Sequence, residues 1–342
     1  MVKSNISQKE EQILKSINVN SDNDPKKPEY PPWNPRFPTT PTYKIKIPGF
    51  NEVLLKDESK NPTGTHKGRL AWEIVCWYKS FLEAKKLGAI NTELPQFSVI
   101  SSGNSAYALA YFLQKFDLPK PKILIDINTK KSIIDFLRKQ YCELYFTDLS
   151  RKALESREIL ALTENRNGFD ITSNNALEPA SIFYDWMSFE IINNAPNYVL
   201  LPFGSGDLFT NICNCIKKQI VANKKDPRLM VDINKLRTCN IIGATVNIPT
   251  TKADKLYSPH LPFVHFDEHW LAFYKKFGYI GESSGVSIVS EEHLEEAIDM
   301  AKQLGVECEP SGIAGLAYLL QNKQRLPKNK RILIVSTGKG VI

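Results

Sequence analysis

The stretch at residues 56–69 constrains this chain of 342 residues more than any other, and it reads KDESKNPTGTHKGR. An apolar run at residues 53–55 precedes it, Asn-Pro and Gly within it favour a turn, and apolar residues with helical spacing begin at Leu70. The pattern predicts a strand, a turn and a helix in direct succession, with Thr65 as the helix N-cap. Lys67 then lies in the first turn of the helix.

This position favours chemistry at the Lys67 amine. The positive end of the helix dipole disfavours a second positive charge, so we expect the pKa of Lys67 to be lowered. A neutral amine of this kind can form a Schiff base with an aldehyde cofactor. An isolated lysine after a turn is usually a solvated surface charge, so other parts of the chain must decide between these two interpretations.

The rest of the chain predicts alternating strands and helices. Apolar runs predict strands at residues 97–100, 123–127, 143–146, 198–203, 240–244 and 332–336. Helical spacing predicts helices from about residues 104, 131, 150 and 208, and at residues 181–192, 291–304 and 311–321. Apolar strands that do not alternate with polar residues are typical of parallel sheets covered by helices on both faces, which is an α/β fold. The length indicates one bilobed unit or two domains.

Three further turns resemble anion-binding loops. They read ISSGNSA at residues 100–106, PFGSGDL at residues 202–208 and STGKG at residues 336–340. The first two join a predicted strand to a predicted helix, and backbone N–H groups at a helix N-terminus bind carboxylates and phosphates. Each alone is more often an ordinary turn.

Together the four stretches resemble, in the same order, the motifs of the fold-type-II pyridoxal-phosphate (PLP) enzymes. Their lysine motif runs Lys-x-Glu-x-x-x-Asn-Pro-Thr-Gly-Ser-Phe-Lys-Asp-Arg, and the family includes threonine synthase, cysteine synthase, the serine/threonine dehydratases and the tryptophan synthase β chain. The resemblance implies PLP as the cofactor and two lobes, each a mostly parallel sheet flanked by helices. We expect an N-terminal arm at residues 1–39, a large PLP-binding domain at residues 40–75 and 161–342, and a small mobile domain at residues 76–160.

The resemblance also implies roles for individual residues. Lys67 is expected to hold the cofactor as an imine and, once a substrate amine displaces it, to remove the substrate's α-proton. Asn104 is expected at the cofactor's 3′ oxygen and Thr337 at its pyridine nitrogen. The substrate carboxylate is expected on Ser102, Gly103 and Ser105, and the cofactor phosphate on Gly204, Ser205, Gly206, Asp207 and Leu208.

Two of these residues, His66 and Asp207, have side chains that bear on how a phosphate would bind. His66 precedes the lysine as a histidine does in the tryptophan synthase β chain, where it lies near the cofactor phosphate. A carboxylate facing a phosphate would repel it, so we expect Asp207 to offer its backbone N–H while its side chain caps the helix or turns outward.

Among relatives, threonine synthase is nearest, by the Ser-Ser-Gly-Asn-Ser and Thr-Gly-x-Gly motifs. This implies a lyase that converts O-phosphohomoserine to threonine. Glu178 points elsewhere, because it stands where threonine synthase has an arginine that helps hold the substrate phosphate. Gly68 also departs from the pattern, since the family usually has an aspartate after the lysine. The alternative is a β-replacing or β-eliminating enzyme of the cysteine synthase, diaminopropionate synthase or serine/threonine dehydratase type. A protein of this fold without turnover, acting as a regulatory partner, is the alternative from another class, and the retained Lys67, Asn104 and Thr337 argue against it.

Composition bears on partners and compartment. The net charge of +7 comes from scattered lysine pairs without aromatic interleaving, which argues against nucleic-acid binding. No apolar run approaches a membrane span, and the N-terminus lacks a signal-like apolar segment. The six cysteines show no zinc-site spacing and fit buried thiols in a reducing compartment. We therefore expect a cytoplasmic enzyme for a small amino-acid substrate, without a metal. We also expect a homodimer, from the family and from a proline-rich arm whose Trp33 and Phe37 dock on the body or on a second subunit.

Overall fold

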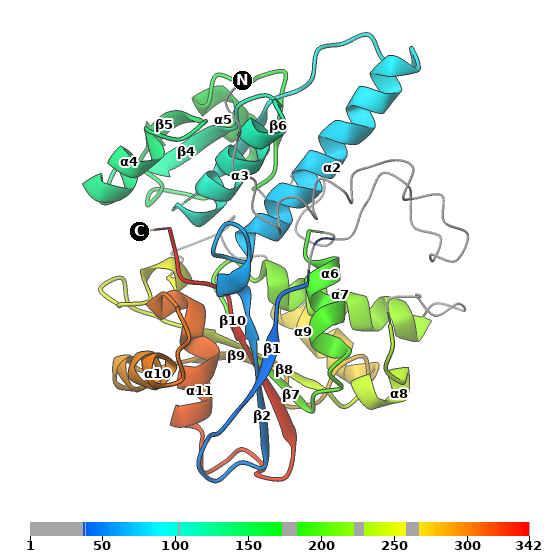
Figure 1. Cartoon of the computed structure of the whole chain (residues 1–342), viewed down its shortest axis with the longest axis vertical. Helices are drawn as coiled ribbons and strands as arrows, with labels where there is room; N and C mark the ends of the chain where they lie inside the picture. Colours follow the sequence, from blue (N-terminus) through cyan, green and yellow to red (C-terminus); the bar gives the residue numbers. More distant parts are fainter. Residues whose placement is uncertain are drawn as a thin grey trace.

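The computed structural model describes residues 37, 39–101, 103–172, 183–221, 229–257 and 267–341, and these residues form two sheets flanked by helices (Figure 1). The larger sheet has the strand order β1-β2-β10-β7-β8-β9. Its strands are β1 (Thr42–Ile45), β2 (Glu52–Asp57), β7 (Tyr198–Pro202), β8 (Asn240–Thr245), β9 (Gly285–Ile288) and β10 (Arg331–Ser336). Its strand pairings are parallel except that of β1 with β2.

Helices bury both faces of the larger sheet. On β7, Leu200 packs with residues of α10 (Glu291–Gln303) and α11 (Ala314–Gln321). Its neighbours Val199 and Leu201 point the other way, since successive strand residues face opposite sides. They join the apolar cluster that contains residues of α6 (Asp185–Ile192), α7 (Asp207–Val221), α8 (Ile233–Leu236) and α9 (Glu268–Lys276). Burial on both faces explains the non-alternating apolar strands and confirms the predicted α/β fold.

The smaller sheet is parallel throughout and has the strand order β5-β4-β3-β6. Its strands are β3 (Phe97–Ile100), β4 (Lys122–Asp126), β5 (Glu143–Thr147) and β6 (Phe169–Asp170), and its helices are α3 (Asn104–Lys115), α4 (Lys131–Leu137) and α5 (Ser156–Leu162). The small domain was predicted to end at residue 160, whereas β6 places residues 169–170 in the smaller sheet. The exact division into domains stays a prediction.

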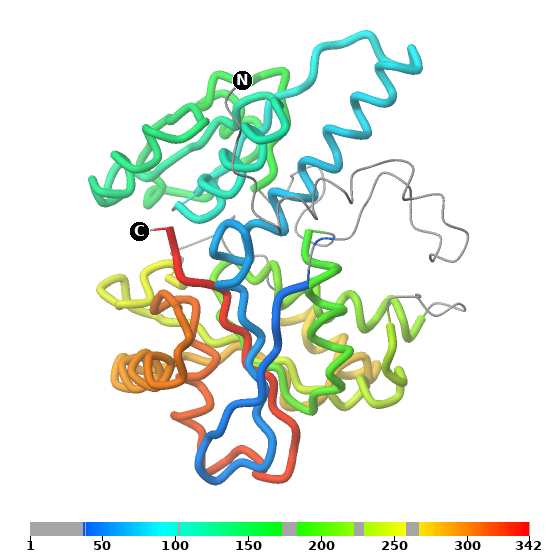
Figure 2. The backbone as a smooth tube through the Cα atoms, viewed as in Figure 1, coloured from blue at the N-terminus to red at the C-terminus, as the bar shows by residue number. Residues whose placement is uncertain are grey.

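Helix α2 (Lys67–Lys86) carries the chain from the larger sheet to the smaller one, where it packs against α3 (Figure 2). The C-terminal strand β10 returns beside β2, so strands from near the two ends of the described chain lie side by side within the larger sheet. Phe37 of the N-terminal arm is buried edge-on against Trp72 of α2 and Phe112 of α3, with centroid distances of 6.2 and 6.4 Å. The arm thus docks on the body at Phe37, while Trp33 lies outside the described residues.

One local prediction was wrong, and three elements were not predicted. The helix predicted from residue 150 begins at Ser156, because Asp148 accepts hydrogen bonds from the amide and hydroxyl of Ser150 and closes a turn there. The sequence also gave no signal for β6, β9 or α9, of which the two strands are short and lie at sheet edges. Within the described part of the chain, no helix has both the length and the apolar character needed to cross a membrane.

Candidate active site

The turn that carries Lys67 is joined to the turn after the last strand. Strand β2 ends at Asp57 and the short helix η2 (Glu58–Lys60) follows. Thr65 pairs with Gly338 as an isolated bridge, and the amide of His66 donates to the Thr337 carbonyl at 2.9 Å. Helix α2 then begins at Lys67 with His66, not the predicted Thr65, in the N-cap position, although the Thr65 hydroxyl accepts from the Lys67 amide at 3.3 Å.

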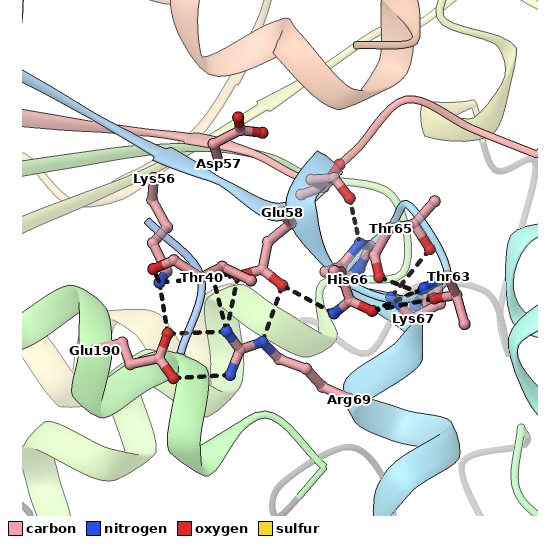
Figure 3. Close-up of polar contacts among 12 residues, drawn as sticks. Thr40, Lys56, Asp57, Glu58, Thr63, Thr65, His66, Lys67, Arg69 and Glu190 are labelled. Carbon is pink, nitrogen blue, oxygen red and sulfur yellow. Dashed lines mark hydrogen bonds and ion pairs between the residues drawn. The ribbon is translucent and has the colours of Figure 1, made fainter. Parts of the chain in front are cut away.

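A buried network of charges lies beneath this turn (Figure 3). Arg69 donates to Glu58 through Nε and Nη2, both at 2.9 Å, and to Glu190 of α6 through Nη1 at 3.0 Å and Nη2 at 2.8 Å. Lys56 Nζ lies 2.5 Å from Glu190, and Thr40 also contacts Glu58. Burial disfavours the Glu58 carboxylate, but Arg69 outweighs it and lowers the pKa of Glu58 to about 2. The network fixes β2, α2 and α6 relative to one another.

The Lys67 amine contacts a residue that sequence reasoning missed. Its Nζ donates to the Tyr184 hydroxyl at 2.9 Å, and Tyr184 is fully buried at the N-cap position of α6. Burial disfavours the charged amine, but the Tyr184 hydroxyl and the Asp207 carboxylate more than offset this, and the pKa of Lys67 lies above its ordinary value. The predicted lowering of this pKa was therefore wrong, because the helix dipole competes with a hydroxyl that accepts from the amine and with the negative charge of a carboxylate on another helix.

His66 is held in its neutral form. Burial and the charge of Lys67 lower the pKa of His66 to about 3. Its Nδ1 lies 3.2 Å from the Thr337 carbonyl oxygen, which only accepts, so Nδ1 carries the proton and Nε2 is left as an acceptor. A hydrogen bond from Nε2 of His66 to a phosphate, as the predicted contact implies, would need a proton on Nε2.

A cavity of about 660 Å³ lies between the two sheets, and residues of both lobes line it. Ten of the twelve predicted site residues are in its lining: His66, Lys67, Asn104, Ser105, Gly204, Ser205, Gly206, Asp207, Leu208 and Thr337. Gly103 occupies the N-cap position of α3 with a φ of 137° and is not a lining residue. Ser102 lies outside the described residues.

The loop between β7 and α7 forms a cradle for an anion. A Cβ built on Gly204 would come within 2.9 Å of the Lys255 carbonyl oxygen, and Gly206 has a φ of 85°, so both positions favour glycine. The first amides of α7 have no acceptor within the helix, and the helix dipole adds positive potential there. Asp207 does not turn outward as one prediction had it, because its side chain lines the cavity and accepts from the Ser205 hydroxyl at 2.8 Å.

A second polar cluster faces the cavity across the two lobes. Asn104 Nδ2 donates to Glu309 at 2.8 Å, and the Asn104 side-chain oxygen Oδ1 accepts from Lys255 Nζ at 3.3 Å. Lys255 also forms an ion pair with Glu309, and its backbone amide donates to the Ser311 hydroxyl at 3.2 Å. Sequence reasoning missed Lys255, because it lies in η3 (Asp254–Leu256) within a loop that has no motif of its own.

The absence of an aspartate after the lysine also has a structural reason. A Cβ built on Gly68 would lie 2.2 Å from Asn61 Oδ1 and 2.7 Å from Thr63 Oγ1. The side chains of the turn therefore fill the space that a residue larger than glycine would need.

The lysine at a helix start, the glycine cradle and the cavity between them fit an aldehyde cofactor that carries a phosphate. Residues 36–338 match the family model described as "Pyridoxal-phosphate dependent enzyme", and the chain belongs to this family. Its cofactor is pyridoxal phosphate, whose ring accepts electrons from the substrate carbon.

The chain is also similar to individual proteins of known activity. A threonine synthase of Synechocystis is 24% identical over 300 residues, which are 84% of this chain and 72% of that protein. Solved structures share the fold at lower identity. An O-ureido-L-serine synthase has a TM-score of 0.62 at 16% identity, over 88% of this chain and 89% of that one. An O-acetylserine-dependent cystathionine β-synthase from Helicobacter pylori has a TM-score of 0.60 at 18% identity, over 88% and 92% of the two chains.

Proposed function

We propose that this enzyme catalyses elimination and replacement at the β or γ carbon of an amino acid, in the manner of threonine synthase. O-phosphohomoserine is then the substrate and threonine the product. Lys67 holds the cofactor and, once the substrate amine has displaced it, removes the α-proton. The neutral Thr337 hydroxyl at the pyridine nitrogen suits this class of reaction better than transamination.

Roles for the other lining residues follow from this assignment. The amides of the loop from Gly204 to Leu208 bind the cofactor phosphate, and Asn104 orients the ring. The turn that contains Ser102, Gly103 and Ser105 holds the substrate carboxylate. Because both lobes line the cavity, a small movement of the smaller lobe would shut water out during the reaction.

A second ammonium group in the cavity, that of Lys255, supports the proposal of a phosphorylated substrate. Lys255 Nζ lies at the Asn104 side of the cavity and is partly exposed, at 23%. A substrate phosphate would compete with Glu309 for the Lys255 ammonium group as a hydrogen-bond partner. The repulsion expected from Glu178, which lies outside the described residues, would then be offset by a cation that the sequence motifs do not contain.

The Lys255–Glu309 pair also supports one alternative. If Glu309 keeps Lys255 neutralised, this side of the cavity carries no net charge and suits a substrate whose leaving group is uncharged until it departs, such as the acetyl ester of serine. The enzyme would then catalyse β-replacement or β-elimination, as expected for a relative of cysteine synthase or of the serine/threonine dehydratases.

A substrate panel distinguishes the two. The cofactor-loaded enzyme is given O-phosphohomoserine, O-phosphoserine, O-acetylserine, serine and threonine, each with and without a thiol as incoming nucleophile, and released phosphate, acetate and keto acid are measured. We expect phosphate release and threonine from O-phosphohomoserine. Turnover of O-acetylserine without turnover of O-phosphohomoserine would replace the proposal by its alternative, and no turnover of any of the five would overturn both.

The Lys255→Met variant tests the role of the second ammonium group. Loss of a charged hydrogen bond costs about 1.5–3 kcal/mol, so KM for O-phosphohomoserine should rise about 10- to 100-fold. Lys252→Met is the matched control, because Lys252 lies in the same loop and its ion pair with Glu295 is exposed. An equal KM in the two variants would contradict the role of Lys255.

We also propose, from the family resemblance, that the enzyme is a cytoplasmic homodimer. Light scattering of the purified protein tests the assembly. A mass of one chain at micromolar concentration would contradict it.

A further inference from the structure

Two contacts join the start of α2 to α6. At one end Lys67 donates to the Tyr184 hydroxyl at 2.9 Å, and at the other Arg69 donates to Glu190 at 2.8 and 3.0 Å. Arg69 follows Lys67 by two residues on α2. Glu190 lies near the C-terminal end of α6, and Tyr184 occupies the N-cap position of the same helix. The buried ion network thus holds the helix that presents Tyr184 to the lysine, so this contact is built into the fold.

The Tyr184 side chain is enclosed on every side. Its ring lies against that of His66, with 5.4 Å between the centroids, and the residue is fully buried. The charged groups that act on it are Lys67 of α2, Asp207 of α7 and Glu58 of η2. Burial raises the pKa of Tyr184, so its hydroxyl keeps its proton at neutral pH.

From this arrangement we propose that Tyr184 is a positioning residue for Lys67, which holds the lysine amine in place and favours its ammonium form whenever the amine is not bonded to the cofactor. The proposal rests on the assignment of Lys67 as the cofactor-binding lysine. A phenol hydroxyl accepts a hydrogen bond from an ammonium group and donates one to a neutral amine, and the first is stronger because its donor is charged. Tyr184 therefore stays hydrogen-bonded to Lys67 before and after the lysine takes up the substrate's proton.

The hydroxyl can be removed without removing the ring. Tyr184→Phe keeps the contact with His66 and deletes only the hydrogen bond to Lys67. Tyr78→Phe is the matched control, because Tyr78 is buried on the same helix as Lys67 but its hydroxyl donates to the Pro95 carbonyl oxygen at 2.5 Å. Urea unfolding of both variants shows whether they fold as the unmodified enzyme does.

The test measures how fast pyridoxal phosphate attaches to Lys67 in cofactor-free protein between pH 6 and 10. The product is fixed with borohydride, and the modified lysine is identified and quantified by mass spectrometry. Attachment needs the neutral amine, so loss of a hydroxyl that favours the ammonium form should make it about tenfold faster at neutral pH in Tyr184→Phe. Tyr78→Phe should behave as the unmodified enzyme does.

Different failures have different meanings. If Lys67 is modified in both proteins with the same pH dependence, the role of Tyr184 is overturned and the assignment of Lys67 stands. If Lys67 is not modified in the unmodified enzyme, both are overturned. If Tyr184→Phe does not fold, the proposal is tested on the cofactor-free unmodified protein by its reaction with trinitrobenzenesulfonate. Lys67 should react at higher pH than the exposed lysines do. A lower pH for Lys67 would refute the proposal.

Discussion

The substitution Glu58→Gln tests the buried network that supports the lysine turn. Glu58 is fully buried and accepts two hydrogen bonds from Arg69, both at 2.9 Å. Glutamine has nearly the same volume, but it carries no charge and its amide would turn N–H donors toward a guanidinium that only donates. Arg69 would then share the one remaining carboxylate, that of Glu190, with Lys56.

The magnitude follows from the pKa of Glu58. It falls from its ordinary value of 4.5 to about 2, and at 1.36 kcal/mol per pKa unit this corresponds to about 3 kcal/mol of stability at neutral pH. Because folding lowers this pKa, the contribution is complete above pH of about 4.5 and is lost as the pH falls toward about 2. Breaking a buried ion pair from one side costs a similar amount, about 3–5 kcal/mol.

Urea unfolding, followed by circular dichroism from pH 3 to pH 7, measures both effects. We expect Glu58→Gln to lower the free energy of unfolding at pH 7 by about 3 kcal/mol and to lose less stability than the unmodified enzyme as the pH falls. Glu83→Gln, at an exposed position of α2, is the control and should change little. A variant as stable as the unmodified enzyme at pH 7, with the same dependence on pH, would refute the reasoning.

Two glycine substitutions test the shape of the site. Gly204→Ala should weaken pyridoxal phosphate binding about tenfold or more, because its Cβ would lie 2.9 Å from the Lys255 carbonyl oxygen. Gly285→Ala is the control, since no atom beyond those of its chain neighbours lies within 4 Å of the added Cβ. Fluorescence titration measures both dissociation constants, and equal values would contradict the role of Gly204 in the anion cradle. Gly68→Ala should lower the free energy of unfolding by about 1–3 kcal/mol through its clash with Asn61, and an increase in the urea midpoint would show that the turn can yield.

The fold was largely predictable because its strongest signals are local. Strands buried on both faces appear as short apolar runs, and β3 (Phe97–Ile100) was predicted with its observed bounds. Glycine and proline marked the turns that precede α2 and α7. The edge strands β6 and β9 gave no such signal, because an edge strand has fewer buried neighbours and its residues need not be apolar.

The residues of the site were predictable only where they belong to a sequence motif. The lysine turn, the glycine loop and Thr337 stand in recognisable sequence contexts, and the fold brings them to one cavity. Lys255 lines the same cavity and Tyr184 contacts Lys67, and both come from segments without a motif, so their positions depend on how the elements pack. The prediction for the pKa of Lys67 was wrong for the same reason, since Asp207 lies 140 positions further along the chain and acts on Lys67 through space.

The central claim is that Lys67 binds the cofactor, and two lysines, Lys67 and Lys255, line the cavity described here. The most direct measurement is the visible absorption band that forms when pyridoxal phosphate is added to the cofactor-free enzyme, to Lys67→Ala and to Lys255→Ala. We predict that the band forms in the unmodified enzyme and in Lys255→Ala and is lost in Lys67→Ala. A band that persists in Lys67→Ala and disappears in Lys255→Ala would contradict the account.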